Sequence, residues 1–94
     1  MISVAKFDKM IHAAFPGCTA RNFAGIKKHI QLGNKLMIED GYCDPDNAKD
    51  VLRTVKYIIE DTKAGLRNGS LWLKNGKVCH ETIKTSIKGW QSFS

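Results

Sequence analysis

Apolar residues recur every three or four positions between residues 45 and 67, which is the spacing of one helical face. The pattern predicts a helix from Pro45 to about Ala64 or Arg67, with Asp44 as its N-cap. Two stop signals follow, at Gly65 and Asn68-Gly69. The expected core face consists of Ala48, Val51, Leu52, Val55, Ile58, Ile59, Thr62 and Leu66.

Polar residues of the same predicted helix form a second row, made of Lys49, Arg53, Lys56, Glu60, Lys63 and Arg67. Five of these six side chains are cationic, and like charges one turn apart cost a helix a few tenths of a kcal/mol each. Two interpretations are open. The row is either a solvated outer face, with Glu60 relieving repulsion, or a surface for phosphates or an acidic protein.

Helical spacing also predicts two earlier helices. The first begins at the Ser3 cap and ends at Pro16-Gly17, and its apolar face consists of Val4, Phe7, Ile11 and Ala14 or Phe15. The second begins at the Thr19 cap and runs to about Asp40, with a core stripe of Phe23, Ile26, Ile30 and Met37. Gly33 lies on that stripe. It either lets another backbone approach closely or divides the segment into two shorter helices.

The pattern changes after Gly69. Two apolar-rich arms flank Asn75-Gly76, a pair typical of a type I′ hairpin turn. Lys74 and Lys77 would face each other across that turn, so an irregular loop anchored by a buried Trp72 is the alternative. A short last helix is expected from about His80 or Glu81 to Lys88, with Trp90 on its apolar side.

These elements predict an all-α fold, in which residues 1–94 form a single compact basic domain of three to four helices, with the hairpin around Asn75-Gly76 as an addition. Hydrophobic residues make up 43% of the chain and charged residues 26%, which is ordinary for a globular domain. No apolar run approaches the roughly 18 residues needed to span a bilayer, and no membrane partner is predicted. Three cysteines without a framework spacing indicate reduced thiols and a cytoplasmic protein.

Charge is the feature that departs from an average composition. The net charge is +6, and residues 48–94 hold nine Lys/Arg against four Asp/Glu. Such a surplus favours nucleic acid or an acidic protein as partner. The expected contact residues are Lys49, Arg53, Lys56, Lys63, Arg67, Lys74 and Lys77, with Trp72 and Trp90 as aromatic contacts.

Motifs for catalysis or metal binding are weak. The acidic stretch from Asp44 to Asp50 resembles a calcium loop but has Ala48 and Lys49 where the loop needs an oxygen ligand and a glycine. Cys79-His80 lacks the paired spacing of a zinc site, and no activated nucleophile or phosphate loop is evident. The sequence therefore predicts no enzyme, no cofactor and no metal.

A helix-turn-helix is an alternative way to bind nucleic acid. The two helices that meet at Pro16-Gly17 would form it, and the Asn75-Gly76 hairpin would act as a wing. Its second helix would carry Arg21, Asn22, Lys27 and Lys28 toward a groove.

The functional prediction is a non-enzymatic nucleic-acid-binding or regulatory domain that uses a basic helix face. The alternative is a protein-interaction module, an inhibitor or adaptor, that binds an acidic protein surface or forms homo-oligomers.

Overall fold

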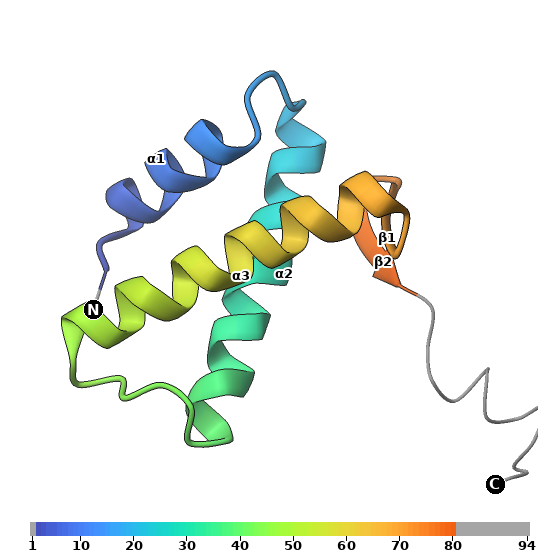
Figure 1. Cartoon of the computed structure of the whole chain (residues 1–94). Helices are drawn as coiled ribbons and strands as arrows, with labels where there is room; N and C mark the ends of the chain where they lie inside the picture. The colour runs from blue at the N-terminus through green and yellow to red at the C-terminus, as the bar shows by residue number, and fades with distance from the viewer. Residues whose placement is uncertain (1, 81–94) are drawn as a thin grey trace, which may run out of the picture.

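The computed structural model describes residues 2–80, which form three helices followed by a two-stranded antiparallel hairpin (Figure 1). Helix α3 crosses α2, α1 lies beside them, and the hairpin follows the C-terminal end of α3. The predicted small helical bundle with a hairpin is confirmed, whereas the predicted last helix and Trp90 lie outside the described residues. The elements are α1 (Val4–Ala14), α2 (Ala20–Glu39), α3 (Ala48–Asn68), β1 (Leu71–Lys74) and β2 (Lys77–His80).

The predicted caps of the first two helices are confirmed. The hydroxyl of Ser3 accepts a hydrogen bond from the Lys6 N–H at 3.2 Å, and that of Thr19 accepts one from the Asn22 N–H at 3.1 Å. Each hydroxyl satisfies a first-turn N–H that has no partner within its helix. Helix α2 runs without a break through Gly33, so the alternative of two shorter helices is wrong.

Helix α3 begins three residues later than predicted. Its N-cap is Asn47, whose side-chain oxygen accepts from the N–H groups of Lys49 and Asp50. The predicted cap, Asp44, instead accepts from the Asp46 N–H, while its own N–H donates to the Asp50 carboxylate at 2.7 Å. These bonds hold residues 44–47 as a loop, so Pro45 precedes the helix rather than opening it.

The core lies where the three helices meet. Its buried apolar residues are Phe7, Ile11, Ile26, Ile30, Cys43, Val51, Val55, Ile58 and Ile59. The predicted core face of α3 is confirmed in its middle, but Ala48 at its start is exposed.

Two further residues of the α3 core face, Thr54 and Gly65, were missed, and both are buried. Thr54 is fully enclosed, and its hydroxyl donates to the Asn34 side-chain oxygen at 2.9 Å. A buried hydroxyl needs such a partner. Gly33 faces the core as predicted, but the neighbour it admits is the Ile58 side chain and not another backbone, since a Cβ there would lie 3.3 Å from the Ile58 Cγ2 atom.

The hairpin is confirmed, and the irregular-loop alternative is wrong. Asn75 and Gly76 have φ values of +53° and +75°, the left-handed conformation that a type I′ turn requires. Lys74 pairs directly with Lys77, and Trp72 pairs with Cys79. Trp72 is 43% exposed, so the expectation that it anchors the core is also wrong. Within residues 2–80, no helix has the length and hydropathy to cross a membrane.

Candidate functional site

The cationic row of α3 is only partly available to a ligand. Arg53 donates to the Asp50 carboxylate at 2.7 Å and to the Tyr42 carbonyl at 3.3 Å, and Lys63 lies 3.8 Å from the Glu60 carboxylate. These two cations are partly neutralised by acids of their own helix. Among residues 2–80, Lys49, Lys56 and Arg67 form no ion pair.

Lys77 of the hairpin belongs to a different surface, formed with α2. A cleft of about 510 Å³ lies along the seam between the hairpin turn and α2, and no residue of the α3 row lines it. Its α2 wall presents the cations Arg21 and Lys28 together with His29, and its hairpin wall presents Lys77. The remaining lining residues are Ala24, Gly25, Leu32, Asn75, Gly76 and Val78.

Glycines allow the hairpin turn to lie directly on α2. A Cβ placed on Gly25 would overlap the carbonyl oxygen of Gly76, and a Cβ placed on Gly76 would overlap the side chain of Arg21. Both positions therefore require glycine for close approach, and Gly76 also requires it for its positive φ. The turn is docked on α2, which argues against a free wing that enters a groove.

Among residues 2–80, no carboxylate lines this cleft. Residues 9–38 and 62–80 contain no Asp or Glu at all, whereas residues 39–50 contain five of the nine acids in the chain. Those five acids lie around the α2–α3 connection, at the lower left of Figure 1, away from the hairpin. The fold thus separates an acidic end from a basic one. The five acids are Glu39, Asp40, Asp44, Asp46 and Asp50.

The hairpin register extends the basic surface beyond the cleft. Trp72 and Lys74 lie two residues apart on one face of β1, and Lys77 lies directly opposite Lys74. On α2, Lys28 and the exposed Lys35 follow Arg21 at seven-residue steps, which places all three on one side of the helix. We call this set the hairpin–α2 surface, which consists of Arg21, Lys28, Lys35, Trp72, Lys74 and Lys77.

The helix-turn-helix alternative is not supported by the positions of its residues. Lys27, which that alternative placed beside Lys28, points to α1 and forms an ion pair with Asp8 at 2.8 Å. Asn22 is half-buried near the start of α2. Of the four residues that this alternative directs toward a groove, only Arg21 and Lys28 line the same cleft.

His29 is a half-buried ionisable group in the cleft. Burial lowers its pKa below the ordinary value of 6.5, the electrostatic interaction with His80 lowers it further, and Asp61 opposes the shift. The cations Arg21, Lys28 and Lys77 line the same cleft. The folded protein therefore favours the neutral form of His29.

This shift predicts a pH dependence of stability. Because the pKa of His29 is lower in the folded state, the unfolded chain binds more protons below about pH 6.5. The contribution of neutral His29 is complete above that pH and is lost as the pH falls through the folded pKa. Urea midpoints at about pH 7.5 and about pH 5.5 should differ less for His29→Gln than for the wild type. Equal differences in the two proteins would contradict the assignment to His29.

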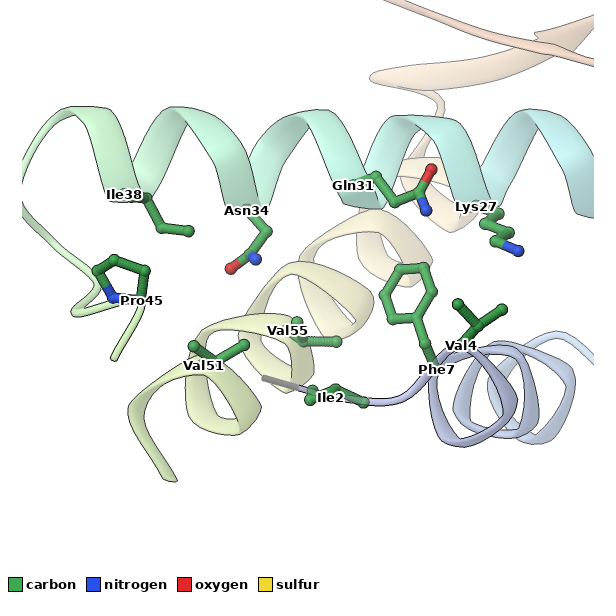
Figure 2. A pocket seen from close by; sticks show the side chains of 10 residues that line it. All are labelled: Ile2, Val4, Phe7, Lys27, Gln31, Asn34, Ile38, Pro45, Val51 and Val55. Atoms are coloured by element: carbon green, nitrogen blue, oxygen red, sulfur yellow. The ribbon is translucent and has the colours of Figure 1, made fainter. Parts of the chain in front are cut away.

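A second hollow, of about 280 Å³, lies between the three helices (Figure 2). Figure 2 shows side chains of α2 projecting toward the Phe7 ring of α1 and toward Val51 and Val55 of α3. Those three residues belong to the core, and the hollow is smaller than most ligand sites, which span about 300–1,000 Å³. We interpret it as the open edge of the core.

Residues 2–80 contain no group of three or more His, Cys, Asp or Glu side chains that could hold a metal ion. Two carboxylates of the calcium-like stretch, those of Asp44 and Asp50, accept backbone N–H groups instead. The described cysteines, Cys18, Cys43 and Cys79, form no disulfide.

Sequence reasoning named Lys74, Lys77 and Trp72 but grouped them with the α3 row. It did not assign Lys35 to a site, and it considered Arg21 and Lys28 only for the helix-turn-helix. The absence of acids between residues 9 and 38 was a signal that could have found them. Comparison of the chain with protein-family models, curated proteins and solved structures gives no match.

Proposed function

We propose that this protein binds nucleic acid through the hairpin–α2 surface. The observation that carries the proposal is the cleft that Arg21, Lys28 and Lys77 line, with no carboxylate of residues 2–80 among the lining residues. Cations gathered around one cleft repel one another, and a polyanion relieves the repulsion while it releases its own counterions.

The hairpin register gives independent support. Lys74 and Lys77 are directly opposite each other, an arrangement of like charges that destabilises an antiparallel pair. No described acid of the hairpin offsets this cost, because residues 71–80 contain none. A phosphate bound between the two ammonium groups would remove the repulsion.

The α3 row contributes less in this proposal. Arg53 and Lys63 already interact with Asp50 and Glu60, whereas Lys49, Lys56 and Arg67 are free to add long-range attraction. Long-range attraction of this kind speeds encounter with a polyanion and gives no fixed register.

The proposal predicts a steep salt dependence. If the five cations of the hairpin–α2 surface each neutralise one phosphate of a single strand, affinity should fall about 100-fold between about 50 and 200 mM salt. Fluorescence anisotropy with labelled oligonucleotides measures this slope. Absence of binding at the lower salt concentration would refute the proposal.

Two matched variants distinguish the surfaces. Arg21→Gln/Lys28→Gln/Lys77→Gln and Lys49→Gln/Lys56→Gln/Arg67→Gln remove the same number of charges, one set from the cleft and the other from α3. We expect the cleft variant to lose more affinity and to reduce the salt slope by about 2, and the α3 variant to change the slope little. Circular dichroism checks that both remain folded. Equal losses would mean that only net charge matters.

An acidic protein is the second candidate partner, because apolar side chains adjoin the cleft. Leu32 lines it, and Leu36 lies one turn further along α2; they are 53% and 49% exposed. An acidic amphipathic helix could cover the leucines and pair with Lys28 and Arg21. Leu32→Ser/Leu36→Ser should then abolish partner binding while nucleic-acid affinity is unchanged. Light scattering of the protein alone tests the homo-oligomer version.

A further inference from the structure

The side chain of Trp72 is the first observation that defines the ligand more closely. It lies on the outer face of β1 at 43% exposure, whereas its neighbours Leu71 and Leu73 are turned inward and half-buried. Leu73 and its cross-strand partner Val78 pack against the core. The outer face of the described hairpin therefore presents a large, partly exposed aromatic ring.

Cations flank this ring on both strands. Lys74 follows Trp72 on the same face at about 7 Å along the strand, and Lys77 is its diagonal neighbour on β2. An aromatic ring with basic side chains beside it is the arrangement by which proteins hold unpaired bases, with the ring stacked on the base and the cations near the phosphates.

The docked turn excludes the usual way for a hairpin to contact a duplex. The Gly76 carbonyl lies against α2 at Gly25, so the turn cannot project into a groove unless the hairpin separates from α2. The face of the hairpin, rather than its tip, is thus the part available to a ligand. The bases of a duplex are already stacked and paired, so a duplex offers this face only its phosphates.

We infer that the hairpin–α2 surface binds single-stranded nucleic acid, with one base stacked on Trp72 and the backbone following Lys74, Lys77 and the cleft toward Arg21 and Lys28. This inference rests on the proposed function and names the form of nucleic acid that the site takes. DNA and RNA share the chemistry that it uses, namely phosphates and aromatic bases.

The test compares single strands with a duplex on the full chain. A Trp90→Phe protein leaves Trp72 as the only tryptophan, and its fluorescence reports stacking directly. The probes are labelled oligo-dT and oligo-U of about 12 nucleotides and a DNA duplex of about 12 base pairs. We expect both single strands to quench Trp72 and to bind at least about tenfold more tightly than the duplex.

A pair of variants tests the ring itself. Trp72→Ala should weaken single-strand binding by about 5- to 150-fold, and Trp72→Phe should retain most of the affinity, because stacking on one base contributes about 1–3 kcal/mol. Duplex affinity should change little in both. If Trp72→Ala proves poorly folded by circular dichroism, the quenching measured in the Trp90→Phe protein decides the question.

The outcomes separate the inference from the function on which it rests. Duplex binding equal to or tighter than single-strand binding, or single-strand binding without quenching of Trp72, would overturn the inference and leave the proposed function standing. Failure of all three probes to bind at about 50 mM salt would overturn both.

Discussion

Gly25→Ala is expected to destabilise the protein although it replaces glycine with the best helix former. Alanine favours a helix interior over glycine by about 1 kcal/mol. At this position its Cβ would overlap the carbonyl oxygen of Gly76, a backbone atom that cannot rotate away as a side chain can. Either the hairpin turn separates from α2 or the backbones of the turn and the helix are strained. Overpacking of this kind costs about 1–3 kcal/mol.

Gly33→Ala is the matched control on the same helix. Its Cβ would lie 3.3 Å from the Ile58 Cγ2 methyl, a contact that requires a shift of only a few tenths of an ångström. Gly33→Ala should therefore change stability much less than Gly25→Ala, and the gain in helix propensity could make the change favourable. Urea unfolding followed by far-ultraviolet circular dichroism measures both.

The same variant connects stability to the proposed site. Separation of the turn from α2 would move Lys77 away from Arg21 and Lys28 and expose the backbone of residues 71–80 to hydrogen exchange. We expect faster exchange in the hairpin and weaker oligonucleotide binding in Gly25→Ala, and neither change in Gly33→Ala. A Gly25→Ala protein with wild-type stability and exchange would show that the turn does not rest on α2.

Helix caps show how far local signals can predict an element. Ser3 and Thr19 are the natural N-cap residues at the starts of their helices, and both were predicted correctly. The stretch before α3 offers Asp44, Asp46 and Asn47 within four residues, so the signal is degenerate. The choice is made by the hydrogen bond between the Asp44 N–H and the Asp50 carboxylate, a contact that composition and spacing do not specify.

In the candidate site, too, the features set by adjacent residues were predictable and those set by distant contacts were not. The Asn75-Gly76 turn was predictable because its φ values follow from two adjacent residues. The docking of that turn on Gly25 was not, because it joins segments that are far apart in the chain and depends on the crossing of α2 and α3. Lys77 could therefore be named as a contact residue from the sequence, while its neighbours Arg21 and Lys28 could not be assigned to it.

The first helix shows that a hydrophobic pattern does not predict how deeply each apolar residue is buried. Val4 and Ile11 both belong to the predicted apolar face of α1. The structure buries Ile11 completely, at 0% exposure, and leaves Val4 at the helix start 68% exposed. A periodic pattern identifies the face of a helix, but it does not say where along the helix the neighbouring elements end.

Ile11→Ala should cost about 2–5 kcal/mol of unfolding free energy, because it removes buried methyl and methylene groups and leaves a cavity among packed side chains. A domain of this size has only about 5–15 kcal/mol in total, so the loss is a large fraction of it. Val4→Ala, the control from the same face, should change stability by less than about 0.5 kcal/mol.

The loss of stability in Ile11→Ala should also be larger in α1 than in the rest of the chain. Helix α1 is held to α2 by the Asp8–Lys27 ion pair and by the stacking of His12 on Phe23, whose ring centroids are 3.9 Å apart. Neither contact replaces the packing of Ile11, since an ion pair that is still partly exposed to water contributes only about 1 kcal/mol. Amide exchange in residues 4–14 should therefore accelerate more than exchange in α3. Equal acceleration everywhere would mean that α1 unfolds only with the whole domain.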